Sequence, residues 1–164
     1  MNIGLIGTGA YGQAMAMMLL KNNNDVIMWT ENEDKYKFYK ENNRIKSLIN
    51  GVEIPKEIKL TNDIKEVCLN KDIMFIMTTA HYVGKICDEI NPYITKKTIV
   101  CIASKGIENV SCKFLSDIAY EKLKTKHIAI ISGPSFAVDM ANSYPVGLSI
   151  ASLSKKSIKR IKKI

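Results

Sequence analysis

The stretch that decides the fold opens the chain and reads Ile3-Gly4-Leu5-Ile6-Gly7-Thr8-Gly9-Ala10-Tyr11-Gly12. A short apolar run leads directly into a Gly-x-Gly-x-x-Gly turn, and a stretch with a helical pattern, 11–22, follows it. Such a hexapeptide is a weak signal by itself, because glycines are common in turns. Between a strand and a helix, however, it predicts a site that binds the diphosphate of a dinucleotide.

Each glycine of the turn has its own physical task. Gly7 allows the tight turn out of the strand, Gly9 lets the backbone approach a pyrophosphate, and Gly12 lets the helix lie close to the strand. The helix N-terminus then directs free N–H groups and a partial positive charge at the anion. The alternative, a glycine-rich turn without a ligand, would lose stability for no gain.

An acidic residue supports the same interpretation. Glu31 lies just past the second apolar run and 19 residues beyond the last glycine of the turn. At about that distance a dinucleotide fold places an acid that accepts from the ribose hydroxyls of the adenosine. A carboxylate there would repel the 2′-phosphate of NADP and so favours NAD, although Lys35 and Lys37 are near enough in sequence to compensate. As an alternative, Glu31, Glu33 and Asp34 suit the first turn of a helix.

The rest of the chain alternates apolar runs with helical stretches. The runs are nearly continuous rather than alternating, as strands buried on both faces of a parallel sheet require. After the first run they span 26–29, 73–77, 99–102, 128–131 and 146–150, with a weaker one at 58–60. The helical stretches span 11–22, 33–43, 63–69, 81–90, 111–124 and 134–141, and Ser154 caps a last basic stretch. This order predicts an α/β fold with a doubly wound, mostly parallel, Rossmann-like sheet in three layers.

Length and composition exclude several classes of protein. The 164 residues, 46% hydrophobic and 24% charged, suit one globular domain. No run approaches the ~18 apolar residues of a membrane span. The net charge of +8 is concentrated, because residues 155–164 hold six cations and no acid and the remainder carries only two net positive charges. A nucleic-acid partner is therefore not expected. The four cysteines lack C-x-x-C spacing, so we expect no metal site and a cytoplasmic location.

Two further turns follow predicted strands. The first reads Ser104-Lys105-Gly106-Ile107-Glu108, and the second reads Ser132-Gly133-Pro134-Ser135-Phe136-Ala137. An ammonium at the first turn can attract a phosphate or polarise a carbonyl, although a lone loop lysine is usually only solvated. Pro134 suits a first helical position, and the N–H groups after it could hold a phosphate; the alternative is an ordinary helix cap.

Together with Trp29 at the end of the second run, these turns make the chain similar to a known family. Over its whole length it resembles the NAD(P)-dependent glycerol-3-phosphate dehydrogenases of the bacterial type. That resemblance implies an oxidoreductase that interconverts dihydroxyacetone phosphate and sn-glycerol 3-phosphate for glycerophospholipid synthesis. It also implies an N-terminal dinucleotide-binding domain followed by a C-terminal helical domain, with residues 1–164 forming the first, incomplete at its C-terminal end, and the second absent.

The resemblance also assigns roles to residues. For the cofactor, NAD or NADP, the residues are Gly7, Gly9, Ala10, Tyr11, Gly12, Glu31, Lys105 and Ala137. For the phosphorylated substrate they are Lys105, Gly133 and Ser135. Two positions depart from the family pattern: Ala10 lacks the hydroxyl that is common there, and Glu31 stands where bacterial members often carry His or Arg. A preference for NADP therefore does not carry over.

The family's general acid/base is a lysine in a segment beyond the last strand seen here, so no catalytic residue is expected within 1–164. We accordingly expect the chain to bind NAD(H) without turning over substrate; a homodimer of the longer form is compatible with the resemblance. Two alternatives stay open. One is the cofactor domain of a related dehydrogenase, of the ketopantoate reductase or 6-phosphogluconate dehydrogenase type. The other is a non-catalytic NAD-sensing module.

Overall fold

The computed structural model describes all residues, 1–164, as one seven-stranded sheet flanked by helices. The strands are β1 (Asn2–Ile6), β2 (Asp25–Trp29), β3 (Lys59–Thr61), β4 (Ile73–Ile76), β5 (Ile99–Ile102), β6 (Ile128–Ser132) and β7 (Ser149–Ala151). The helices are α1 (Ala10–Lys21), α2 (Glu33–Asn42), α3 (Ile64–Cys68), the 3₁₀ turn η1 (Ala80–Tyr82), α4 (Val83–Ile90), α5 (Leu115–Lys122), α6 (Ala137–Ala141) and α7 (Lys155–Ile161).

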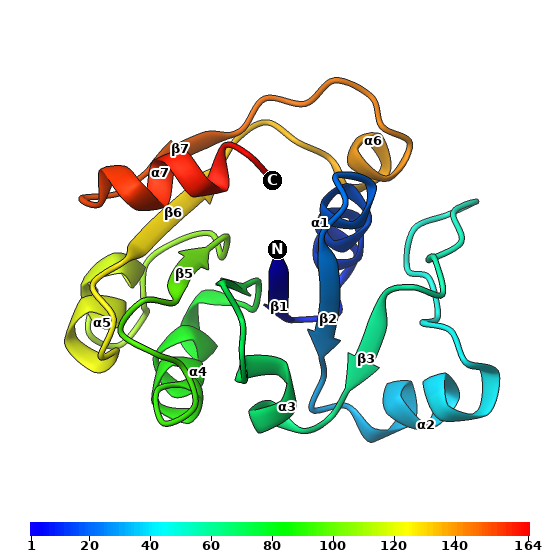
Figure 1. Cartoon of the computed structure of the whole chain (residues 1–164), viewed down its shortest axis with the longest axis horizontal. Coiled ribbons are helices and arrows are strands. Elements are labelled where there is room, and N and C mark those ends of the chain that lie inside the picture. The colour runs from blue at the N-terminus through cyan, green and yellow to red at the C-terminus, as the bar shows by residue number, and fades with distance from the viewer.

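The sheet has the strand order β3-β2-β1-β4-β5-β6-β7, and its first six strands are parallel. The chain runs outward from β1 to β3 and then crosses back to β4 on the other side of β1 (Figure 1). The carboxyl ends of β1 and β4 therefore form a topological switch point, which is where open α/β sheets bind ligands. The predicted doubly wound, mostly parallel sheet is confirmed.

Helices cover both faces of the sheet and make three layers (Figure 1). One apolar core lies between the sheet and the side that carries α1 and α6, and it also takes in the loop 44–58 and Ile161 of α7. A second core lies against α3, α4 and α5. The residues of β1 from Ile3 to Ile6 are buried, and Ile3 and Leu5 face one core while Ile6 faces the other. This two-sided burial explains the continuous apolar runs in the sequence.

Some predicted boundaries differ from the structure. The helix expected over 111–124 begins only at Leu115, because Cys112 has a positive φ of 54° and Ile107 forms a β-bridge with Phe114. The last strand is only the three residues of β7, and it pairs antiparallel with β6. The stretch 81–90 is a 3₁₀ turn followed by α4.

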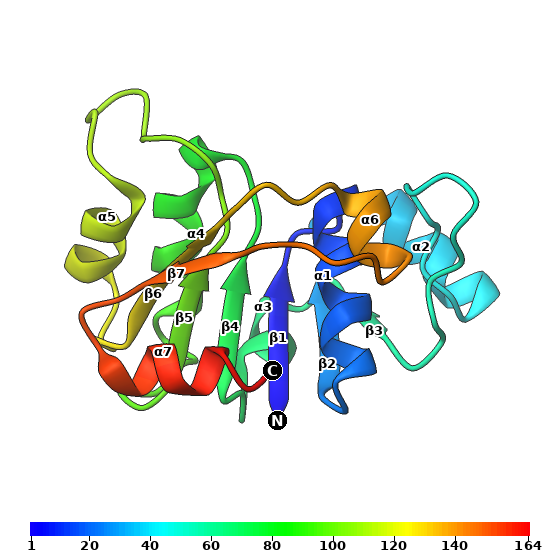
Figure 2. The ribbon, with the colours of Figure 1, turned by 90° about the horizontal axis from the view of Figure 1, so that it is seen from above.

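The final helix returns to the start of the sheet. Ser154 caps α7 by accepting from the Ser157 N–H, as predicted. The Arg160 guanidinium donates to Asp72, 2.9 Å away, and the Asn22 amide donates to the Ile164 carbonyl. The two chain ends consequently lie side by side (Figure 2).

Among the helices, none is long and apolar enough to cross a membrane.

Candidate functional site

The glycine turn has the geometry that its sequence predicts. Gly7 has φ +119°, and a Cβ there would lie 2.5 Å from the Met77 carbonyl oxygen. A Cβ on Gly12 would collide with the carbonyl oxygen of Gly7, so α1 approaches the strand more closely than a side chain allows. A Cβ on Gly9, in contrast, would meet nothing within 4 Å. Gly7 and Gly12 are therefore required by the close packing of the turn, whereas Gly9 leaves open space in front of the helix.

The N-terminus of α1 is free to receive an anion. Gly9 is its N-cap residue and has no side chain, and the first turn of the twelve-residue helix contains no acidic residue. The early N–H groups of a helix have no intrahelical acceptor, so they need an outside partner. Together with the open space at Gly9, this cradle fits the diphosphate of a dinucleotide.

Beside the turn, a short chain of polar groups joins three elements. The Lys35 ammonium on α2 donates to the Thr8 hydroxyl over 3.2 Å, and that hydroxyl donates to Thr30 over 3.3 Å. Thr30 also accepts from the Asn32 N–H. The β1–β2 register explains the pairing, since Ile6 lies opposite Trp29 and the residues just beyond both strands are neighbours.

Glu31 extends past β2 into solvent, and 62% of its side chain is exposed. Its carboxylate lies 3.8 Å from the Lys85 ammonium of α4, which also pairs with Glu89 at 3.6 Å. Glu31 thus stands just past the end of β2, as predicted, and its ion pair joins it to α4.

On the other side of the turn, the structure brings together three predicted residues. The Tyr11 and Ser135 hydroxyls form a hydrogen bond of 3.0 Å, although they are 124 positions apart in sequence. The Lys105 ammonium lies 5.9 Å from the centre of the Tyr11 ring. A Cβ on Gly133 would collide with the Gly147 carbonyl oxygen, so this segment also packs too closely for a side chain. Tyr11 therefore links the glycine turn to the two later turns.

The prediction for Pro134 is wrong. The helix α6 begins at Ala137, with Phe136 in extended conformation as its N-cap residue, so Pro134 lies in the loop before the helix. The residue pair Gly133 and Pro134 forms part of a longer connection from β6, and α6 itself has only five residues. The helix N-terminus that was expected to follow Pro134 is consequently displaced by three residues, while Ala137 opens α6 half-buried.

Gln13 is a positioning residue that sequence reasoning missed. Its buried side-chain amide donates to the Lys46 carbonyl over 2.9 Å and accepts from the Leu48 N–H over 2.8 Å. Gln13 thereby ties the loop 44–55 to α1. Apolar residues surround it in the sequence, and the only signal was a polar side chain on the buried face of a predicted helix.

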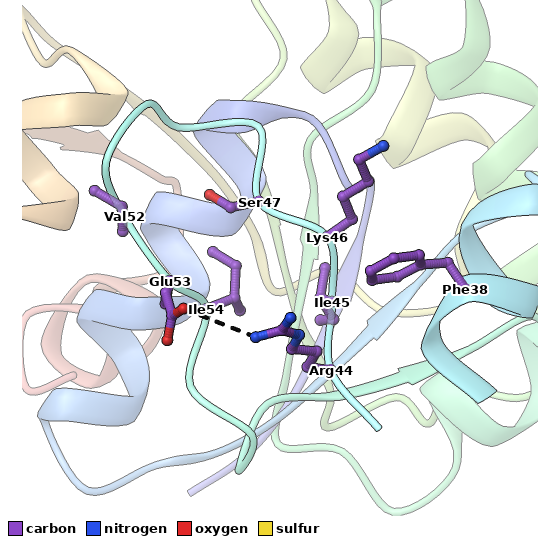
Figure 3. A pocket seen from close by; sticks show the side chains of 8 residues that line it. All are labelled: Phe38, Arg44, Ile45, Lys46, Ser47, Val52, Glu53 and Ile54. Carbon is purple, nitrogen blue, oxygen red and sulfur yellow. Dashed lines mark ion pairs between the residues drawn. The ribbon is translucent and has the colours of Figure 1, made fainter. Parts of the chain in front are cut away.

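An open hollow of ≈ 170 Å³ lies between this loop and Phe38 of α2 (Figure 3). Across it, Arg44 pairs with Glu53 at 3.7 Å, and the Lys46 ammonium lies 6.0 Å from the Phe38 ring. The lining residues are Phe38, Arg44, Ile45, Lys46, Ser47, Val52, Glu53 and Ile54. None of them is a predicted site residue, so this hollow is separate from the glycine turn.

Three of the four cysteines, Cys68, Cys87 and Cys101, are buried in the core, whereas Cys112 is exposed. Burial raises the pKa of the Cys68 and Cys87 thiols to about 12, and it raises the pKa of Cys101 further. These side chains are therefore protonated at neutral pH and act as small apolar groups rather than nucleophiles.

Comparison with known proteins shows the family of the chain. Residues 2–158 match the model of the NAD-dependent glycerol-3-phosphate dehydrogenase N-terminus. The chain belongs to this family. It is 32% identical over 167 residues to the glycerol-3-phosphate dehydrogenase of Leptospira biflexa, covering 100% of this chain and 50% of that protein.

Solved structures of the family have the same fold. The glycerol-3-phosphate dehydrogenase of Coxiella burnetii superposes with a TM-score of 0.88 at 22% identity, over 99% of this chain and 50% of that one. The Plasmodium falciparum enzyme gives 0.86 at 20% identity, over 99% and 49%. The chain thus spans about half the length of the glycerol-3-phosphate dehydrogenases it matches, and it corresponds to their N-terminal NAD-binding domain.

Proposed function

We propose that this chain binds NAD(H) or NADP(H) at the glycine turn and forms the cofactor half of an enzyme that interconverts dihydroxyacetone phosphate and sn-glycerol 3-phosphate. The observation that carries the proposal is the turn itself. Gly7 and Gly12 leave no room for a Cβ, while Gly9 faces open space at an uncapped helix N-terminus. A dinucleotide diphosphate has the charge and the size for such a cradle.

In this proposal the remaining site residues divide between cofactor and substrate. The amides of Ala10 and Tyr11 contact the cofactor, and Glu31 lies near the adenosine ribose. When bound, the nicotinamide supplies the hydride. The Lys105 ammonium contacts both ligands and attracts the substrate phosphate, which is a suitable task for a compact positive charge.

Three residues of the second turn complete the proposed contacts. Gly133 and Ser135 hold the substrate, and Ala137 borders the cofactor. The bond from Tyr11 places the Ser135 hydroxyl next to the glycine turn, so cofactor and substrate groups converge there. No residue of 1–164 is assigned as the general acid/base. In this proposal the sn-glycerol 3-phosphate made by the whole enzyme serves glycerophospholipid synthesis.

Calorimetric titration of the chain with NADH tests the proposed cofactor site. The change Gly9→Val should abolish the binding heat, because its side chain would fill the space intended for the diphosphate. Gly9 has an extended φ of −68°, which valine tolerates, so thermal unfolding should be unchanged. As a control, Gly84→Ala on α4 should bind like the parent. Absence of heat from the parent chain would refute the proposal.

Activity gives a second, independent test. We expect the 164-residue chain to show no reduction of dihydroxyacetone phosphate by NADH, because it lacks an assigned proton donor for the developing alkoxide. Loss of NADH absorbance in the presence of substrate is the measurement. Turnover by the purified chain would show that a residue within 1–164 carries the acid/base role.

A further inference from the structure

The last ten residues, 155–164, carry six cations and no acid. Within this segment α7 buries Ser157 and Ile161, while its lysines are exposed. Arg160 is the one cation of the segment that forms an ion pair, and its partner is Asp72. No ion pair in the structure involves the other five cations, which are Lys155, Lys156, Lys159, Lys162 and Lys163. The surface of this segment therefore holds five positive charges without a charged partner.

Two contacts place α7 along the amino ends of the parallel strands. At its start, the Ser154 hydroxyl lies 3.0 Å from Nδ1 of His127, directly before β6. Near its end, the Arg160 guanidinium donates to Asp72, directly before β4. Figure 2 shows α7 crossing the sheet beside the starts of its strands. Three more exposed lysines precede β5 and β6 at this edge, and with the five lysines of 155–163 they form what we call the basic face: Lys96, Lys97 and Lys126.

The start of α7 carries charges of the wrong sign for its own helix dipole. Lys155 and Lys156 are its first two residues, and its first turn contains no acidic residue. A helix N-terminus has a partial positive charge, so cations there lower the stability of the helix. The stability of the fold therefore does not account for these two lysines, whereas attraction of an outside anion would.

An exposed leucine beside the basic face distinguishes between the possible anions. Leu153 directly precedes the cap residue Ser154, and 88% of it is exposed. A membrane surface attracts lysines through its anionic headgroups and accepts an apolar side chain between them. Nucleic acids are bound instead through arginines that pair with bases and aromatic rings that stack on them. The segment 153–164 contains no aromatic residue, and its one arginine is held by Asp72.

We propose that the basic face, together with Leu153, binds the surface of a membrane that contains anionic phospholipid. Each lysine close to such a surface strengthens binding by about fivefold, and the leucine adds apolar contact. The inference goes beyond the proposed function and does not rest on it. The glycine turn follows the carboxyl end of β1, whereas the basic face lies at the amino ends of the strands.

Sedimentation of the chain with lipid vesicles tests the inference. The parent chain should bind vesicles of equal parts phosphatidylglycerol and phosphatidylcholine at low salt, and it should not bind phosphatidylcholine alone. About 0.5 M NaCl should release it, because salt screens the lysine charges. The double change Lys155→Glu and Lys156→Glu should weaken binding by at least about tenfold. The same change should raise the melting temperature, since acids suit a helix N-terminus, so unfolding cannot explain the loss.

The matched control is the double change Lys37→Glu and Lys40→Glu on α2. Both lysines are exposed, and α2 lies at the opposite end of the molecule from α7 (Figure 1). Each double change lowers the formal net charge of +8 by four, so a difference between the two variants reports the position of the charge. The control should bind anionic vesicles within about twofold of the parent, because its charges lie more than a Debye length from the basic face. Leu153→Ser should weaken binding by about fivefold through the lost apolar contact.

Several results would overturn the inference: equal losses in the two double variants, equal binding to neutral and anionic vesicles, or no binding to anionic vesicles. A short DNA duplex provides the competing anion. If the duplex bound the parent more tightly than the vesicles did, and Leu153→Ser bound the vesicles normally, the face would be a nucleic-acid surface and the inference would be wrong.

NADH titration separates this inference from the proposed function. The variant with Glu at positions 155 and 156 should bind NADH like the parent, because the glycine turn lies at the other edge of the sheet. A parent chain that binds anionic vesicles but not NADH would support the inference and refute the proposed function. A parent chain that binds NADH but not the vesicles would overturn the inference alone.

Discussion

The two sides of the candidate site are built differently. The side formed by β1, the glycine turn and α1 is fixed by backbone packing, since Gly7 and Gly12 leave no room for a Cβ. The side formed by the loops after β5 and β6 carries large exposed side chains, with Phe114 67% and Phe136 74% exposed. Within this side Gly133 packs tightly against the Gly147 backbone, but its link to the glycine turn is made by side chains, such as the bond from the Tyr11 hydroxyl to Ser135. The contrast teaches that changes at the tightly packed Gly7 and Gly12 should damage folding and binding together, whereas changes on the second side should alter local order.

The largest effect is expected from Gly12→Ala. Alanine favours a helix by about 1 kcal/mol over glycine, but here its Cβ would collide with the Gly7 carbonyl oxygen. Because a backbone atom cannot rotate away, we expect a net loss of about 3 kcal/mol in the free energy of unfolding. Urea denaturation measures it, and NADH binding should be lost with it.

Gly84→Ala is the matched change on the opposite face of the sheet. Its Cβ would make ordinary contacts of 3.6 Å with Ile118 and Lys122, so helix propensity should dominate and raise stability by up to about 1 kcal/mol. If both alanine variants were equally stable, backbone packing would not be what fixes the glycine turn.

An intermediate loss of stability is expected from Gln13→Leu. The change removes two part-buried hydrogen bonds of the buried Gln13 side chain and leaves the Lys46 carbonyl and the Leu48 N–H without their partner. We expect stability to fall by about 2 kcal/mol. Hydrogen exchange should also become faster in the loop 44–55, which Gln13 ties to α1. The exposed Asn42→Ala, which loses one local bond to Phe38, serves as the control and should change stability by less than about 0.5 kcal/mol.

A smaller and more local effect is expected from Tyr11→Phe. Loss of the hydrogen bond to Ser135 should cost about 1 kcal/mol. Hydrogen exchange should accelerate in the loop before α6 and stay unchanged in β1, because the ring and the strand packing remain. The same change at the exposed Tyr144 should alter neither region. If hydrogen exchange in Tyr11→Phe also became faster throughout β1, the two sides of the site would not be stabilised independently.

The smallest expected effect is on the pH dependence of stability, and it comes from Asp72, which belongs to neither side of the site. Burial works to raise the pKa of Asp72, but the Asn2 N–H and the Arg160 guanidinium outweigh it and hold the pKa below the ordinary 3.8. A carboxyl with a depressed native pKa stabilises the fold above its unfolded pKa, and that stability is lost as pH falls through the native value. Asp72→Asn should therefore lower stability at pH 7 by less than about 1 kcal/mol, because the pair with Arg160 is partly exposed. In acid denaturation series the difference from the parent should shrink below about pH 4.

Much of the first side could be predicted because its determinants are local. Four consecutive buried positions in β1 require an apolar run, and the glycine spacing specifies the turn directly. The same reasoning found β2, β4, β5 and β6, since each is buried on both faces.

The second side depends on features that a hydrophobic pattern does not contain. The positive φ of Cys112 ends the expected helix, although cysteine gives no hint of that conformation. The bond from Tyr11 to Ser135 joins residues 124 positions apart, and outside this side the Glu31–Lys85 pair requires β2 and β4 to flank β1. Such contacts follow from the topology of the sheet, so only a three-dimensional structure shows them.

Both outer strands of the sheet, β3 and β7, have only three residues, whereas the inner ones have four or five. An outer strand exposes backbone N–H and C=O groups to which a foreign strand can attach, and the strength of that attachment grows with length. Outer strands of three residues expose few such groups. The molecule consequently presents a poor template for fibril growth, despite the very apolar strands in its interior.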